Sequence, residues 1–212
     1  MSLSQLLHDA IDSGVHQIGQ IRILTQPFRL HHIDDVLSDE LEVHTDPDDA
    51  REIGLYTESG RYRFTKGELS LKKGWVFYLK SIDEVHQALD LFYPASLGIW
   101  RALNQNTLRI QHLREKLSRQ TGMYRFTQNI STKGAQELVQ KVCGPSNQCV
   151  KRILWKIDEQ TPLEPSEASE FNGILKDCHT NEAIPLLCQE ACNYFVSETR
   201  KKVKEEFDAS QS

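Results

Sequence analysis

The chain has 212 residues, 39% of them hydrophobic, which is enough for a packed core in one large domain or two small ones. No apolar run approaches the roughly 18 residues that a membrane-spanning helix needs. The first twenty residues have neither a basic start nor the continuous hydrophobic stretch of an export signal. The sequence therefore predicts a cytoplasmic protein without a membrane segment.

The net charge is −5, and its distribution along the chain is uneven. The first 100 residues carry 9 basic and 16 acidic side chains, whereas the remainder carries 16 basic and 14 acidic ones. A surface that binds nucleic acid needs a much stronger positive charge than this. DNA or RNA binding is therefore not predicted.

The first third of the chain alternates between helix and strand signals. Apolar residues recur at helical spacing from Leu3 to Ile11, which predicts an amphipathic helix. Residues 20–24 and 28–33 alternate in the manner of two half-buried strands joined by a turn at Pro27, which predicts a hairpin. The acidic stretch that follows is interpreted as a solvated loop with a helix beginning at Pro47.

The middle of the chain continues the mixed pattern. Residues 74–80 are rich in aromatic and β-branched side chains, and Ser81 then begins a capping box, so a strand and a helix are expected in turn. A second helix is expected after Pro94, and further strands at residues 107–111 and 123–127. Strands and helices mixed without βαβ regularity indicate an α+β fold.

The character of the sequence changes after residue 130, where strand signals fade and cysteines begin. We therefore expect an α+β domain over residues 1–130 and a small, mainly helical domain over residues 131–212. A helix is predicted from Ser131 to Cys143, where Gly144 and Pro145 end it.

Four of the five cysteines form two pairs, Cys143 with Cys149 and Cys188 with Cys192. Pro185 suits the first turn of a helix, on which Cys188 and Cys192 would share one face, with the helix dipole favouring the thiolate of Cys188. An odd number of clustered thiols without an export signal indicates metal binding rather than disulfides.

The spacing of the thiols leaves two kinds of centre open. Zinc sites made of four cysteines more often use the C-x2-C spacing, whereas the wider C-x5-C and C-x3-C spacings suit a bulkier iron-sulfur cluster. Four thiolates leave such a complex negatively charged. Five basic residues near the ligands are candidates to offset that charge: Lys151, Arg152, Arg200, Lys201 and Lys202.

Three other polar or aromatic features are interpreted more simply. Glu190 is expected to cap a helix or to pair locally. Trp155 and Tyr194 are interpreted as core aromatics that also suit the shielding of a cluster. The adjacent residues His31 and His32 would face opposite sides of a strand, so they are not expected to chelate one ion.

Two cysteine-bearing segments carry a resemblance to a known family. CGPSNQCVKRILWKID, from Cys143 to Asp158, and IPLLCQEACNYFVSETRK, from Ile184 to Lys201, closely resemble a [4Fe-4S]-binding domain of bacterial proteins that also carry CbiX-type sirohydrochlorin chelatase domains. The segments SGRYRFTKGELSLKKGW, LDLFYPASLGIW and SRQTGMYRFTQNIS resemble the α+β stabilising domain that precedes it.

The resemblance implies that Cys143, Cys149, Cys188 and Cys192 bind one [4Fe-4S] cluster. Cys178 matches no motif position and is interpreted as a spare buried thiol, with a substitute ligand or an oxidation-sensitive neighbour as alternatives. The sequence shows no chelatase domain, so we expect an accessory redox or structural protein, not catalytic on its own, that serves a chelatase or redox partner protein. The alternatives are a zinc-stabilised interaction module and a chelatase-related enzyme that acts on a porphyrinoid.

Overall fold

The computed structural model describes residues 2–38, 40–56, 71–108, 111–143, 149, 151–156 and 182–211, with the side chain of Arg152 left aside. The chain divides into two compact units. The first unit contains the described residues up to 108 together with 182–186, and the second contains 111–156 and 187–211. Each unit is described by itself.

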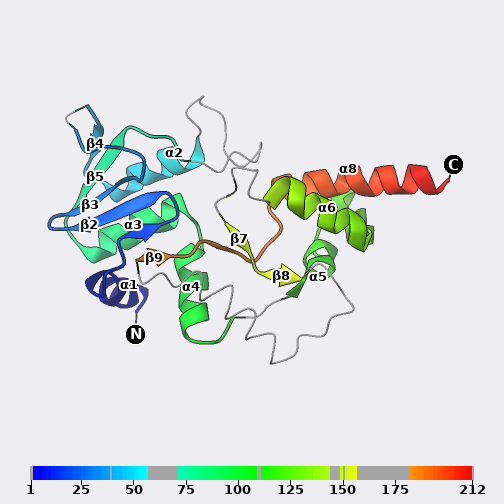
Figure 1. Cartoon of the computed structure of the whole chain (residues 1–212), viewed down its shortest axis with the longest axis horizontal. Coiled ribbons are helices and arrows are strands. Elements are labelled where there is room, and N and C mark those ends of the chain that lie inside the picture. The colour runs from blue at the N-terminus through cyan, green and yellow to red at the C-terminus, as the bar shows by residue number, and fades with distance from the viewer. Residues whose placement is uncertain are drawn as a thin grey trace. The chain divides into compact units, whose positions relative to one another are not determined.

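The first unit is built on a six-stranded mixed sheet with the order β4-β5-β3-β2-β1-β9. Its centre is antiparallel, whereas the pairs β4–β5 and β1–β9 are parallel. Figure 1 shows the strands side by side. Their bounds are Gln17–Ile18 (β1), Ile21–Thr25 (β2), Phe28–His32 (β3), Glu42–His44 (β4), Trp75–Leu79 (β5) and Ala183–Ile184 (β9).

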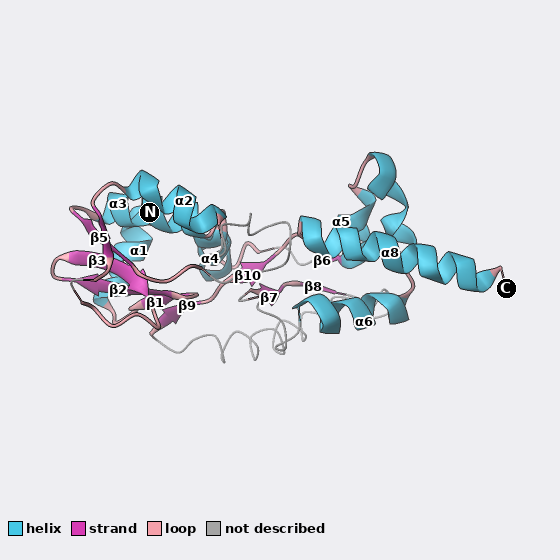
Figure 2. Ribbon diagram, turned by 90° about the horizontal axis from the view of Figure 1, so that it is seen from above, coloured by secondary structure: helices cyan, strands magenta, loops and turns pink. Residues whose placement is uncertain are grey.

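Helices pack against this sheet, and α3 contacts strands β3 and β5. The aromatic core between them includes Trp75, which stacks on Phe92 at 4.9 Å between ring centroids. Figure 2 shows α2 and α3 together beside the sheet. The helices are α1 (Leu3–Asp12), η1 (Pro47–Asp49), α2 (Ala50–Leu55), α3 (Ile82–Phe92) and α4 (Ser96–Asn104).

The second unit is mainly helical, with two short parallel strand pairs, β6–β8 and β7–β10. Helices α6 and α8 pack together, and η3 contacts both α5 and α8. The elements are β6 (Gln111–His112), α5 (Leu113–Ser118), η3 (Gly122–Asn129), α6 (Thr132–Cys143), β7 (Arg152–Ile153), β8 (Trp155–Lys156), β10 (Leu187–Cys188) and α8 (Asn193–Ser210). Its core contains Leu113, Leu117, Ile130, Ala135, Leu138, Val142, Trp155, Phe195, Val196 and Val203.

The structure confirms the α+β class and most of the predicted elements. The N-terminal helix, the hairpin β2–β3, strand β5 and helices α3 and α4 all lie where the sequence patterns place them. Ser81 caps helix α3 as predicted, because its Oγ accepts the backbone N–H of Glu84 at 3.3 Å, whereas the Glu84 carboxylate bonds the N–H of Lys80, one residue before the cap, at 2.7 Å. Helix α6 begins beside Ser131, whose Oγ accepts the N–H of Gly134 at 2.9 Å, and ends at Cys143.

Two predicted strands are wrong in whole or in part. Residues 123–127 belong to the 3-10 helix η3, because the buried positions there are three residues apart, with Thr127 and Ile130 almost fully buried. Among the described residues of the range 107–111, only Gln111 is in a strand, and the Thr107 N–H bonds back to Ala102 near the end of α4. Residues 109 and 110 lie outside the described part of the chain.

The division into units brings α5 and η3 together with α6 and α8. The domain boundary near residue 130 stays a prediction about which segments fold independently. None of the helices in the described ranges has the length and apolar character that crossing a membrane demands.

Candidate metal centre

Cys143, Cys149, Cys188 and Cys192 come from separate elements of the second unit. Cys143 is the last residue of α6, and Cys149 precedes strand β7. Strand β7 pairs in parallel with β10, opposite Cys188, and the Leu154 N–H bonds to the Cys188 carbonyl at 2.9 Å. This pairing holds the segment that follows Cys149 against the segment that carries Cys188.

The helix predicted from Pro185 is wrong, because Leu187 and Cys188 form strand β10 and α8 begins only at Asn193. Cys192 is the N-cap of α8, and its Sγ accepts the backbone N–H of Phe195 at 3.4 Å. The positive end of the helix dipole therefore faces Cys192 rather than Cys188. The two cysteines are presented by a strand end and a helix start, not by one helical face.

The thiols nevertheless gather in one region. The pKa of Cys143 is raised to about 12, first by burial and then by the neighbouring thiols of Cys149, Cys192 and Cys188, in that order. The pKa of Cys188 is likewise raised by the thiols of Cys192 and Cys149, and the pKa of Cys149 is raised by the thiol of Cys192. Every pair among the four thiols is thus within electrostatic reach of each other.

Burial is also the main cause that raises the pKa of Cys149 and of Cys188. The ammonium of Lys151 opposes this increase at both thiols. At both residues, burial therefore favours the protonated thiol over the thiolate. In that state Cys188 Sγ donates to the Glu190 carbonyl at 3.1 Å, and Cys149 Sγ lies 3.8 Å from the Lys151 carbonyl.

The carboxylate of Glu190 is paired with distant residues rather than locally, contrary to expectation. Lys116 Nζ on α5 lies 2.7 Å from Glu190 Oε1, and Arg119 Nη1 lies 3.5 Å from the same atom. Both partners precede Glu190 by more than 70 residues. The hydrophobic pattern of α5 gave no signal of this contact, because Lys116 occupies a buried position that is usually apolar.

The basic residues expected to offset cluster charge have mostly other partners. Lys201 pairs with Glu198, Lys202 lies 2.6 Å from Glu137, and the Arg200 guanidinium stands 5.7 Å from the centre of the Tyr124 ring. The charge of Lys151, in contrast, acts on the thiols of Cys149 and Cys188.

The donor set fits an iron-sulfur cluster, whose ligands are cysteine thiolates. A second observation also fits, because the indole N–H of Trp155 is buried in the same core as Cys143 and has no hydrogen-bond partner in the described chain. Iron-sulfur centres commonly accept hydrogen bonds at sulfur. Trp155 packs edge-on against Phe195 at 5.3 Å, as expected for a core aromatic.

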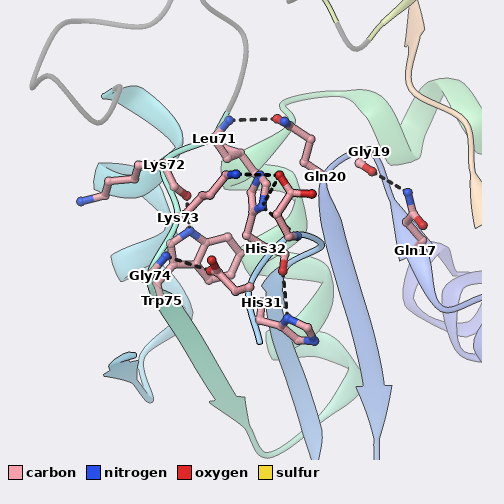
Figure 3. A network of polar contacts seen from close by, with 12 residues as sticks. Gln17, Gly19, Gln20, His31, His32, Leu71, Lys72, Lys73, Gly74 and Trp75 are labelled. Atoms are coloured by element: carbon pink, nitrogen blue, oxygen red, sulfur yellow. Dashed lines mark hydrogen bonds and ion pairs between the residues drawn. The ribbon is translucent and has the colours of Figure 1, made fainter. Parts of the chain in front are cut away.

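The structure places the remaining candidates as follows. His31 and His32 are both buried in the first unit, and His31 Nδ1 lies 2.9 Å from the His32 carbonyl oxygen (Figure 3). His32 Nδ1 instead accepts the backbone N–H of Asp34 at 3.2 Å.

Cys178 lies outside the described residues. Within the described ranges, no three His, Cys, Asp or Glu side chains form a group that would hold a single metal ion.

Comparison with known proteins finds two consecutive family matches. Residues 5–104 match the DR2241 stabilising domain, and residues 105–201 match a 4Fe-4S iron-sulfur cluster binding domain, which contains all four paired cysteines. A search of curated proteins found no match.

One solved structure is similar over nearly the whole chain, that of DR2241 from Deinococcus radiodurans. It matches with a TM-score of 0.71 at 21% identity, and covers 94% of this chain and 40% of that one. DR2241 is described as a multi-domain protein with structural similarity to chelatases and two additional novel domains. At this identity the likeness concerns the fold, and this chain spans less than half of that protein's length. Residues 5–104 thus correspond to a DR2241 stabilising domain and residues 105–201 to a 4Fe-4S iron-sulfur cluster binding domain.

Proposed function

We propose that this protein binds one [4Fe-4S] cluster through Cys143, Cys149, Cys188 and Cys192. The observation that carries the proposal is that all four cysteines lie inside the matched cluster-binding segment, in which the β7–β10 pairing sets the segment after Cys149 against Cys188. Four cysteines are the usual ligand set of such a cluster. One-electron transfer is the chemistry that the cluster supplies when bound.

The protein's own residues prepare this site in three ways. Desolvation favours the neutral thiols of Cys143, Cys149 and Cys188, so that loading is coupled to proton release. The ammonium of Lys151 and the N-terminus of α8 favour negative charge on the sulfurs. The β7–β10 pairing fixes Cys188 beside the segment of Cys149.

The wider role that we propose is an accessory redox or structural part of tetrapyrrole metal chelation, of the sirohydrochlorin or cobalamin type. The resemblance to domains that accompany CbiX-type chelatases supports this, as does the match to a protein with structural similarity to chelatases. A chelatase or a redox protein is accordingly the proposed partner. A ligand set of four cysteines leaves no open position on iron for substrate, which favours the accessory role over catalysis.

Anaerobic reconstitution with iron and sulfide tests cluster binding. The expected product has four irons per chain, broad absorbance near about 400 nm, and an electron paramagnetic resonance signal after dithionite reduction. Cys188→Ala should lose most of this signal, whereas Cys178→Ala, the matched control, should retain it. A colourless protein with stoichiometric zinc would contradict the proposal and favour a zinc-stabilised module.

Incubation of the purified protein with sirohydrochlorin and cobalt or ferrous ion tests the accessory role separately. We expect no metal insertion above the uncatalysed rate by this chain alone. Turnover without a partner would contradict the accessory role and identify a chelatase-related enzyme.

A further inference from the structure

Lys116 is a buried lysine in the core that lies beside the candidate metal centre. Its side chain is only 6% exposed, and its neighbours on α5, Leu113 and Leu117, are almost fully buried in the core of the second unit. A buried ammonium is costly unless it is paired and hydrogen-bonded. Its position in a six-residue helix therefore requires a specific partner.

That partner is Glu190, which lies midway between Cys188 and Cys192 in the sequence. Lys116 Nζ donates to Glu190 Oε1 at 2.7 Å, while Arg119, the residue that caps the C-terminus of α5, approaches the same oxygen at 3.5 Å. Arg119 is itself held by Gln111, whose Oε1 accepts from Nη2 at 2.9 Å. The Glu190 carboxylate is thus held by two cations, one on α5 and one at its C-terminal end.

The segment between the two cysteines is irregular backbone. Residues 189–191 belong to neither strand nor helix, so ladder or helical hydrogen bonds of their own do not define the position of Glu190. The backbone of Glu190 also accepts the Cys188 thiol at 3.1 Å. Any displacement of Glu190 therefore moves an atom that contacts one of the proposed ligands.

We propose that Lys116 is a positioning residue for the cluster, acting through Glu190 to fix the segment that presents Cys188 and Cys192. This inference rests on the proposed function. The charges around Glu190 balance, because the two cations, Lys116 and Arg119, are matched by two carboxylates. The second carboxylate is that of Glu115, which lies 3.6 Å from Arg119. The role follows from geometry rather than from excess positive charge.

The test compares four forms of the full chain: wild type, Lys116→Met, Glu190→Gln and the double variant. Methionine keeps the length and apolar stem of the buried side chain without its charge. Glu137→Gln is the matched control, because it breaks another ion pair of the same unit, in which Glu137 lies 2.6 Å from Lys202. Each protein is reconstituted anaerobically and then exposed to an iron chelator.

We expect Lys116→Met and Glu190→Gln each to lose cluster absorbance about tenfold faster than wild type, since residues that orient metal ligands typically affect metal affinity by at least that factor. The double variant should lose it no faster than either single variant, because both remove the same contact. The reduced single variants should also show altered electron paramagnetic resonance spectra. The control should match wild type.

The stability of the apo-protein separates positioning from a general role in folding. Lys116→Met leaves no buried charge unpaired, because the Glu190 carboxylate is largely exposed to solvent and keeps Arg119 as a partner, so this variant should unfold near the wild-type temperature. If that variant fails to fold, Glu190→Gln carries the test, because this carboxylate is 63% exposed. If both single variants keep the cluster as long as wild type does, this inference is wrong and the proposed function stands. If the wild-type protein binds no cluster, the proposed function and this inference are both wrong.

Discussion

Trp155 combines an apolar ring that packs against Phe195 with an indole N–H that has no partner among the described residues. Leaving a buried donor unsatisfied costs about 1–3 kcal/mol, so such a group commonly serves a bound ligand. Because it shares a core with Cys143, the sulfur atoms of a cluster are the acceptors that we expect for it.

Trp155→Phe tests this expectation, because it keeps an aromatic ring beside Phe195 and removes only the donor. Hydrogen bonds to sulfur stabilise the more negative reduced state, so the reduction potential should fall. The expected change is about 40 mV, the one-electron equivalent of a hydrogen bond worth about 1 kcal/mol. Redox titration followed by visible absorbance measures it. Trp100→Phe, in the first unit, is the control, and an unchanged potential in Trp155→Phe would contradict the assignment.

The four cysteines of the proposed site could be named from the sequence, because the motifs that carry the resemblance are specific and short, and their binding of one cluster stays a prediction. The Lys116–Glu190 pair could not be named in this way, because a contact across 74 residues leaves no local pattern. The sequence pattern of α5 shows only that Lys116 interrupts an apolar stripe. Contacts of this kind depend on tertiary packing, which no window of sequence contains.

Among the elements, helices were predicted more reliably than short strands. Helix α6 has both a cap at Ser131 and an apolar stripe, and these agree. Strand β10 has two residues and is specified by its pairing with β7, so the proline at position 185 suggested a helix instead. In η3 the three-residue period of buried positions is easily mistaken for the two-residue period of a strand.

Helices α6 and α8 are joined by Glu198, which is 9% exposed and lies 3.1 Å from Lys141 Nζ. The hydrogen bond from Lys201, with a further one from Lys141, holds the pKa of Glu198 below its usual value of 4.5. A carboxylate with a lowered pKa stabilises the fold above that value, and this contribution disappears as the pH falls through the folded-state pKa.

Glu198→Gln should therefore lower the unfolding free energy of the apo-protein by about 1 kcal/mol at pH 7, since the lysines are largely exposed to solvent. The difference from wild type should shrink below pH 4.5. Urea unfolding followed by circular dichroism at several pH values measures both effects. Glu205→Gln alters an exposed carboxylate on the same helix and should change stability by less than about 0.5 kcal/mol. A deficit that stays constant at low pH would contradict this account.

At the scale of the whole molecule, the two units have separate cores, and the candidate metal centre belongs to only one of them. Metal binding is coupled to folding where the ligands come from distant segments. Loss of the cluster is therefore expected to loosen the second unit first.

Cys188→Ala should accordingly raise amide hydrogen exchange in α6 and α8 while leaving β2, β3 and α3 protected. Hydrogen exchange measured by mass spectrometry on the anaerobic protein locates the change, with Cys178→Ala as control. Limited proteolysis of the same variant also tests the predicted boundary near residue 130. Equal loss of protection in both units would instead indicate one cooperative folding unit.

Strand β9 pairs with β1 through Ile184 and Ile18, which are more than 160 residues apart. Only Pro185 and Leu186 separate β9 from β10, which carries Cys188. During translation, the first unit therefore obtains its last strand only when the ribosome has almost reached this cysteine. Such long-range pairing is slow to form. The nascent N-terminal unit would therefore leave β1 as an uncovered sheet edge until β9 and the ligand-bearing segment emerge from the ribosome.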